Sequence, residues 1–118
     1  MLKKLPEYEK QLADIDEKLS RPETMQDMKL FKSLNQERSH LAPIIDQLRL
    51  MHSLNTQISE AHQLMKEETD QEMLEMTREE LLEIVKIKDK MIQELKEEVI
   101  SYQILIRQLQ KDMLSSNL

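Results

Sequence analysis

The chain contains no glycine in its 118 residues, and this absence restricts the fold more than any other feature. Glycine is the usual residue at left-handed helix ends, in tight hairpin turns and in phosphate-binding loops. A chain without it makes few reversals, so its regular elements must be long. Strands are disfavoured, because aromatic residues make up only 3% of the chain and charged residues 34%. The composition is typical of long helices and coiled coils, and we expect an elongated all-α molecule.

Two helices are predicted in the first 68 residues. The first covers residues 5–19, because apolar side chains recur there at spacings of three and four, and Pro6 suits its first turn. The second runs from Thr24 to Glu68 after a turn signal and would be about 66 Å long. Pro43 lies in its middle and predicts a kink, with a complete break into two helices as the alternative.

The acidic residues 67–70 predict a reversal of the chain. Thr69 or Asp70 can cap a third helix that starts near Gln71, and Glu72 is favourable in its first turn. No stop signal follows until residues 115–117, so the third helix is long. We expect it to lie antiparallel to the second helix and to complete a helical hairpin with a three-helix N-terminal part.

The last third of the chain shows a heptad pattern. The predicted coiled-coil core consists of Leu81, Val85, Ile92, Leu95, Val99, Tyr102, Ile106, Leu109 and Met113. β-Branched residues at one core position with leucine at the other favour a parallel two-stranded coiled coil. A homodimer, or another coiled-coil partner, is therefore predicted through residues 85–118. Ile100, Ile104 and Leu105 lie off this seam, so a larger bundle or packing against the second helix remains open.

Charge excludes several classes of partner. The net charge is −6, with 18 acidic and 11 basic residues in positions 1–84 and five acidic and six basic residues in positions 85–118. No basic stripe is present, so strong nucleic-acid binding is not expected. No apolar run approaches the roughly 20 residues that span a bilayer, and no membrane contact is predicted. With no cysteine, a soluble protein of the cytoplasm or an organelle matrix is expected.

Residues with catalytic or metal-binding chemistry do not gather in any recognised pattern. The three histidines lack zinc-ligand spacing, and residues 67–70 lack the alternating ligands and glycine of a calcium loop. The carboxylate pairs at 79–80 and 97–98 are predicted to be solvated charges on helix faces. No catalytic residue, cofactor or metal is therefore predicted, and we do not expect an enzyme.

Five short stretches occur in an order that is characteristic of one protein family. They are SRPETM (residues 20–25), KLFKSLNQE (29–37), LAPIID (41–46), DQEMLEM (70–76) and REEL (78–81). Over about residues 5–84 they resemble the N-terminal helical domain of bacterial and organellar type 1 peptide chain release factors. The resemblance implies a three-helix domain with a proline inside its long second helix. It also implies the ribosome as partner, near the stalk base.

The resemblance implies a non-catalytic domain of a factor for translation termination. Peptide release in the family depends on a Gly-Gly-Gln loop, and stop-codon reading depends on Pro-x-Thr; neither occurs in this chain. Two features depart from the family. Gln71 stands where proline is common, and the third helix continues as heptads where the family has a leucine- and proline-rich linker.

These departures predict two domains, a release-factor-like part at residues 1–84 and a coiled-coil extension at residues 85–118. The alternative function is that of a structural coiled-coil scaffold for oligomerisation. In this alternative the chain can be a fusion of a release-factor-like domain with a foreign coiled coil.

Overall fold

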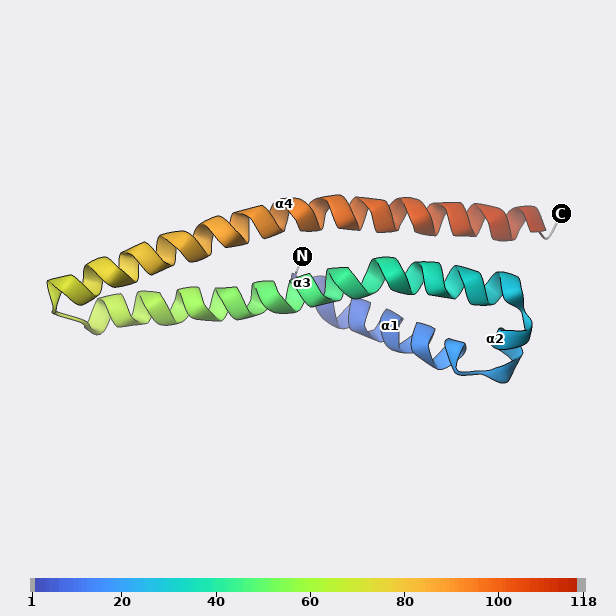
Figure 1. Ribbon diagram of the computed structural model, residues 1–118, viewed down its shortest axis with the longest axis horizontal. Helices are drawn as coiled ribbons and strands as arrows, with labels where there is room; N and C mark the ends of the chain where they lie inside the picture. Colours follow the sequence, from blue (N-terminus) through green and yellow to red (C-terminus); the bar gives the residue numbers. More distant parts are fainter. Residues whose placement is uncertain (1, 117–118) are drawn as a thin grey trace.

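The computed structural model describes residues 2–116, and its helices form an elongated antiparallel hairpin with a shorter helix along one half (Figure 1). The elements are a 3-10 turn Leu2–Lys4 (η1) and the helices Leu5–Leu19 (α1), Pro22–Gln26 (α2), Met28–Glu67 (α3) and Gln71–Ser116 (α4). Residues 2–116 contain no strand. The molecule measures 70 × 25 × 17 Å, and the predicted all-α, elongated fold is confirmed.

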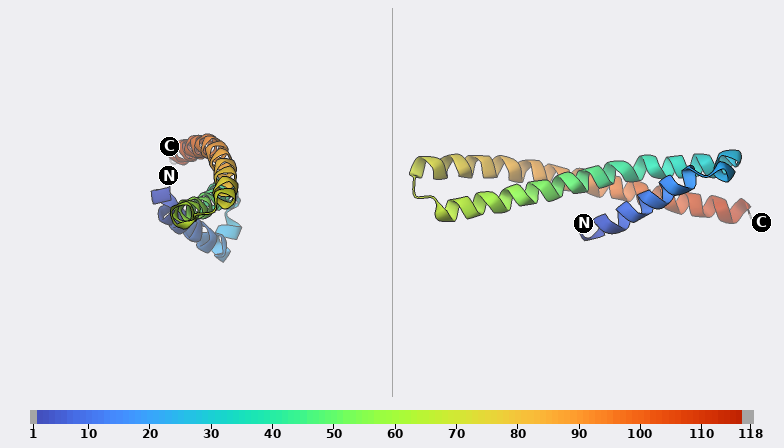
Figure 2. Two further views of the ribbon diagram at one scale, coloured as in Figure 1. Left: turned by 90° about the vertical axis from the view of Figure 1, so that its left-hand side faces the viewer. Right: turned by 90° about the horizontal axis from the view of Figure 1, so that it is seen from below.

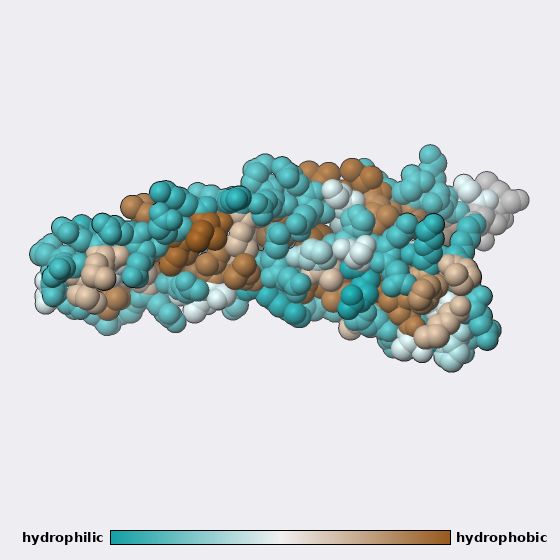
Figure 3. All heavy atoms as spheres, viewed as in Figure 1, coloured by the Kyte–Doolittle hydropathy of each residue, from teal (hydrophilic) through white to brown (hydrophobic). Residues whose placement is uncertain are grey.

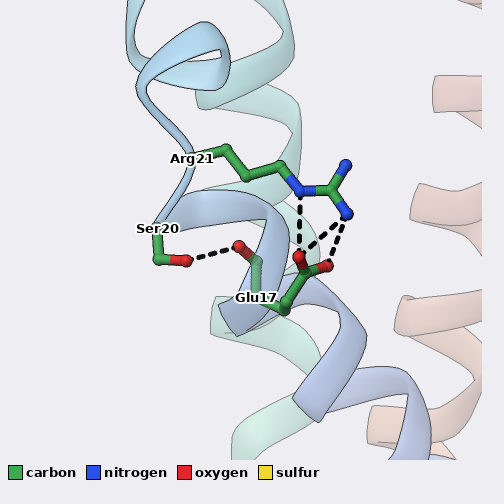
Figure 4. Close-up of polar contacts among 3 residues, drawn as sticks. All are labelled: Glu17, Ser20 and Arg21. Atoms are coloured by element: carbon green, nitrogen blue, oxygen red, sulfur yellow. Dashed lines mark hydrogen bonds and ion pairs between the residues drawn. The ribbon is translucent and has the colours of Figure 1, made fainter.

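Helix α1 begins and ends at the predicted residues. The chain leaves it at Ser20, whose hydroxyl donates to the carbonyl of Glu17 at 2.6 Å. Nε and Nη2 of Arg21 donate to the two carboxylate oxygens of Glu17, each at 2.9 Å (Figure 4). This ion pair orients the chain at the end of α1. It adds little stability, because both side chains are exposed to solvent.

The predicted start of the second helix at Thr24 is wrong. Pro22–Gln26 forms the separate short helix α2, and α3 begins only at Met28. Between them Asp27 has an extended backbone, with φ −98° and ψ 93°, and its Oδ1 accepts the N–H of Leu30 at 3.1 Å. An aspartate at this position satisfies a backbone donor that the first turn of a helix leaves free. Helical periodicity on both sides of Asp27 concealed this single-residue interruption.

Pro43 lies inside α3, which continues without interruption from Met28 to Glu67. The prediction that the helix continues through the proline is confirmed, and the alternative of a complete break is wrong; the kink itself stays a prediction. Proline removes one backbone hydrogen bond from a helix. Leu41, Ile44 and Ile45 are buried beside it, and their packing offsets this loss.

The reversal predicted at residues 67–70 is confirmed, and α4 starts at Gln71 as expected. Oε1 of Glu68 accepts the N–H groups of Thr69 and Asp70 at 3.1 and 3.0 Å. Oδ1 of Asp70 then accepts the N–H of Glu72 at 3.0 Å and caps α4. Side-chain oxygens therefore replace the glycine that such a turn commonly uses. The predicted stop signal covers residues 115–117, and residue 117 lies outside the described residues.

Helix α3 organises the core, because it contacts both α1 and α4. Its buried residues are Leu34, Leu41, Ile44, Ile45, Leu48, Met51 and Leu54. Helix α1 adds Ile15, and α4 adds Met91, Leu95 and Tyr102. The core therefore occupies the half of the molecule in which α1 lies along the hairpin (Figure 2).

Removal of the α3 cap is expected to weaken the fold. Asp27→Ala should lower the free energy of unfolding by about 1 kcal/mol, because the N–H of Leu30 loses its acceptor. Urea unfolding followed by circular dichroism measures the change. Asp14→Ala, at an exposed position within α1, serves as control and should change stability by less than about 0.5 kcal/mol. Equal losses in the two variants would contradict the cap.

Candidate functional site

The predicted coiled-coil core does not lie on an open surface. Leu95 and Tyr102 are buried, while Val85 and Met113 are exposed. The other five are half-buried: Leu81, Ile92, Val99, Ile106 and Leu109. The seam is thus most deeply covered in its middle and open at its two ends.

The cover comes from the same chain. Helix α4 packs along α3, and Ile92, Val99 and Ile106 pack against the central core. Packing against the second helix, which the heptad pattern left open, is therefore observed. Pairing of these nine residues with a second chain stays a prediction, and it would have to compete with the α3–α4 contact.

Tyr102 on α4 contacts both α1 and α3. Its hydroxyl donates to Oε1 of Glu37 on α3 at 3.1 Å, with Oε1 of Gln11 on α1 as a second acceptor at 3.4 Å. Its ring lies beside that of Tyr8, with 6.4 Å between the ring centres. Burial, and next the negative charge of Glu37, raise the pKa of Tyr102 well above its ordinary value near 10. The heptad analysis placed Tyr102 in an apolar core and missed this polar role, although a buried tyrosine hydroxyl needs a partner.

The prediction that Glu98 is a solvated charge is wrong, whereas Glu79, Glu80 and Glu97 are exposed as expected. Oε1 of Glu98 accepts the side-chain N–H of Gln47 at 3.0 Å. Within the described chain, Oε2 of Glu98 and Oε1 of Gln47 are buried and have no hydrogen-bond partner. A contact across two helices determined this burial, and α4 alone carries no signal of it.

Two shallow hollows flank these polar contacts. One, of about 480 Å³, lies beside Pro43 and is lined by Glu94, Glu97, Glu98 and His40, among others. The other, of about 560 Å³, lies beside Tyr102 between α1 and α4. Residues 2–116 contain no group of three or more His, Cys, Asp or Glu side chains that could hold a metal ion. Histidines 40, 52 and 62 are exposed.

A second surface lies where α3 and α4 extend beyond α1. We call residues 58–87 the hairpin end, at the left of Figure 1. None of its apolar side chains is fully buried, and six are exposed: Leu64, Met73, Met76, Leu82, Val85 and Ile87. It carries nine acidic and three basic residues, a difference equal to the net charge of −6 of the whole chain. The hairpin end is therefore an acidic arm of two helices with scattered apolar side chains.

No helix in the described part of the chain has the length and apolar character needed to cross a membrane.

Comparison with known proteins identifies the family. The PCRF domain matches residues 8–111, which is most of the chain. This chain belongs to the PCRF domain family. The match confirms the predicted resemblance, and it passes through residue 84, where a boundary between two domains was predicted. That boundary stays a prediction, and α4 runs through it as one continuous helix.

Three relatives of this PCRF domain chain share one name. It is 32% identical over 71 residues to proteins named peptide chain release factor 1 from two strains of Dehalococcoides mccartyi, BAV1 and CBDB1, and from Clostridioides difficile strain 630. These 71 residues are 60% of the chain and 20% of each relative. The chain thus matches about a fifth of the length of these relatives. No solved structure matches it.

Substitution of the buried carboxylate is expected to stabilise the protein. Glu98→Gln should raise the free energy of unfolding by about 1 kcal/mol, because the new amide can donate to Oε1 of Gln47 and removes a buried charge. Urea unfolding measures this. The matched control is Glu94→Gln, four residues earlier on α4 and exposed, which should be neutral within about 0.5 kcal/mol. A loss of stability in Glu98→Gln would contradict the contact.

Loss of the Tyr102 hydroxyl should change both stability and its pH dependence. Tyr102→Phe is expected to lower the free energy of unfolding by about 1–2 kcal/mol at pH 7, because Glu37 loses a donor. The raised pKa stabilises the folded wild type fully below pH 10, and this stabilisation is lost as the pH rises towards the folded-state pKa. The variant should therefore show a smaller fall in stability above pH 10. Tyr8→Phe is the control. If its free energy of unfolding falls above pH 10 by the same reduced amount, the pH dependence does not come from Tyr102.

Proposed function

We propose that this chain is a non-catalytic helical domain that binds the ribosome in translation termination. The PCRF domain match over residues 8–111 is the observation that carries the proposal. The shared identity with proteins named peptide chain release factor 1 supports the same process. A ribosome-bound role would place the protein in the cytoplasm or an organelle matrix.

The residues of the chain support a docking role without catalysis. The 118 residues include no glycine, so they hold no Gly-Gly-Gln sequence. The two hollows beside Pro43 and Tyr102 are wide and shallow, and neither brings a nucleophile together with a base and an oxyanion-binding group. A rod of 70 Å in which α3 fixes both neighbours is suited to present surfaces at a distance from its core.

The hairpin end is the surface that best fits a docking role. Its six exposed apolar side chains lie outside the packed core, on the paired helices α3 and α4. Charged residues surround them, and the excess of acid disfavours direct contact with RNA phosphates. A protein surface of the ribosome is therefore the better partner for this arm.

Co-sedimentation with bacterial 70S ribosomes tests the proposal. We expect the wild-type chain to pellet with ribosomes and to be displaced by an excess of a full-length release factor 1. Met73→Glu combined with Met76→Glu, on the exposed flank of the hairpin end, should reduce the bound fraction at least fivefold.

The control variant carries Met25→Glu and Met28→Glu, two exposed methionines at the opposite end of the molecule (Figure 1). It should bind like the wild type. Failure of the wild type to pellet would overturn ribosome binding. If the hairpin-end variant binds as well as the control variant and the wild type, ribosome binding stands but does not use the hairpin end.

A second candidate function is that of a coiled-coil assembly module. Exposed isoleucines on α4, in the segment where the heptad pattern predicts a partner, support it. The two functions are compatible in one chain, since docking uses the hairpin end, assembly uses residues 85–118, and the two surfaces share only residues 85–87.

A further inference from the structure

One segment of α4, residues 99–106, is apolar on most of its sides. Between positions 99 and 106, six of eight residues are apolar: Val99, Ile100, Tyr102, Ile104, Leu105 and Ile106. Tyr102 is 7% exposed, whereas Ile100 is 55% and Ile104 59% exposed. Helices that are apolar all round are normally buried. Because α3 covers only one side of this segment, the other side lacks a partner among residues 2–116.

The exposed side forms a continuous stripe. Glu97, Ile100, Ile104 and Arg107 follow one another at spacings of three, four and three, so they share one face of the helix. We call these four residues the outer face of α4. Apolar atoms gather along the upper edge of the molecule over this part of α4 (Figure 3).

The outer face of one α4 helix is complementary to the outer face of a second α4 helix that runs in the opposite direction. About position 102, Ile100 is the counterpart of Ile104, and Glu97 is the counterpart of Arg107. In an antiparallel pair of α4 helices each isoleucine therefore meets an isoleucine, and each carboxylate meets a guanidinium. A parallel pair in register would place Glu97 against Glu97 and Arg107 against Arg107, which is repulsive.

The complementarity extends along the helix. With the axis beside residue 102, position 88 lies opposite position 116, so about 43 Å of helix overlaps. Over this whole overlap, no two positions that face each other carry like charges. Two equal chains related by a twofold axis form the most common kind of closed assembly.

We propose that two copies of this chain pair antiparallel through the outer faces of their α4 helices, about a twofold axis beside residue 102. The pair leaves the α3–α4 contact intact, which pairing through the heptad seam would not, because Leu95 and Tyr102 are buried within each chain. It is independent of ribosome binding, and the hairpin end stays free. The heptad periodicity is then explained by packing inside one chain.

Sedimentation equilibrium of the full chain tests the pairing. We expect the wild type to reach twice its chain mass of 14.1 kDa at micromolar concentration. Ile100→Glu with Ile104→Glu should weaken association at least a hundredfold, since four carboxylates would meet at the axis. Both residues are exposed, so helicity by circular dichroism should stay as in the wild type.

Leu82→Glu is the matched control. Leu82 is 61% exposed and lies eighteen residues, or five full turns, before Ile100 on the same face of α4. It is about 27 Å from Ile100 and outside the overlap, so this variant should associate like the wild type.

A charge exchange decides the orientation. Glu97→Arg alone and Arg107→Glu alone should each weaken association about tenfold, because two attractive contacts become repulsive. The double variant should associate like the wild type. A monomeric wild type, a dimer that survives Ile100→Glu with Ile104→Glu, or a double variant no better than the single ones would each overturn the proposal.

Discussion

The fold depends on the burial of one apolar stripe on α3. Leu41, Ile44, Ile45 and Leu48 are almost wholly buried, and they lie where both α1 and α4 reach α3. Isolated helices as short as the fifteen residues of α1 are marginal in water, so α1 is stable because it docks there. The same packing holds α3 together across Pro43. Beyond the first turn of α1, towards the turn between α3 and α4, burial becomes shallow and these two helices form an exposed arm.

Polar groups at the edge of this core connect specific residues on different helices. The Tyr102 hydroxyl reaches Glu37 on α3 and Gln11 on α1, and Gln47 reaches Glu98. Apolar stripes of repeated Leu and Ile can slide by a turn at modest cost, whereas a misplaced buried polar group loses its partner. These bonds therefore favour one register of α4 on α3, although the Gln47–Glu98 pair leaves two buried oxygens unsatisfied.

The molecule separates its surfaces by charge and position. The acidic hairpin end and the outer face of α4 lie on different parts of the rod, so use of one leaves the other accessible. The docking role proposed for the hairpin end rests on membership of the PCRF domain family. The outer face follows from this chain's own residues, since its isoleucines and flanking charges match only when a second α4 runs in the opposite direction.

The sequence by itself determined the local features: the bounds of α1, the reversal at residues 67–70, the start of α4 and the continuity of α3 through Pro43. Helical periodicity and short-range caps act within a few residues, so they can be recognised in one dimension. The Asp27 cap is also local, but continuous periodicity concealed it. Only the tertiary structure decided that Glu98 is half-buried against α3, with its Oε2 out of contact with solvent, and that the heptad seam is covered by α3 of the same chain. An apolar stripe indicates that a helix needs a partner. The identity of that partner depends on which helix the fold brings within reach.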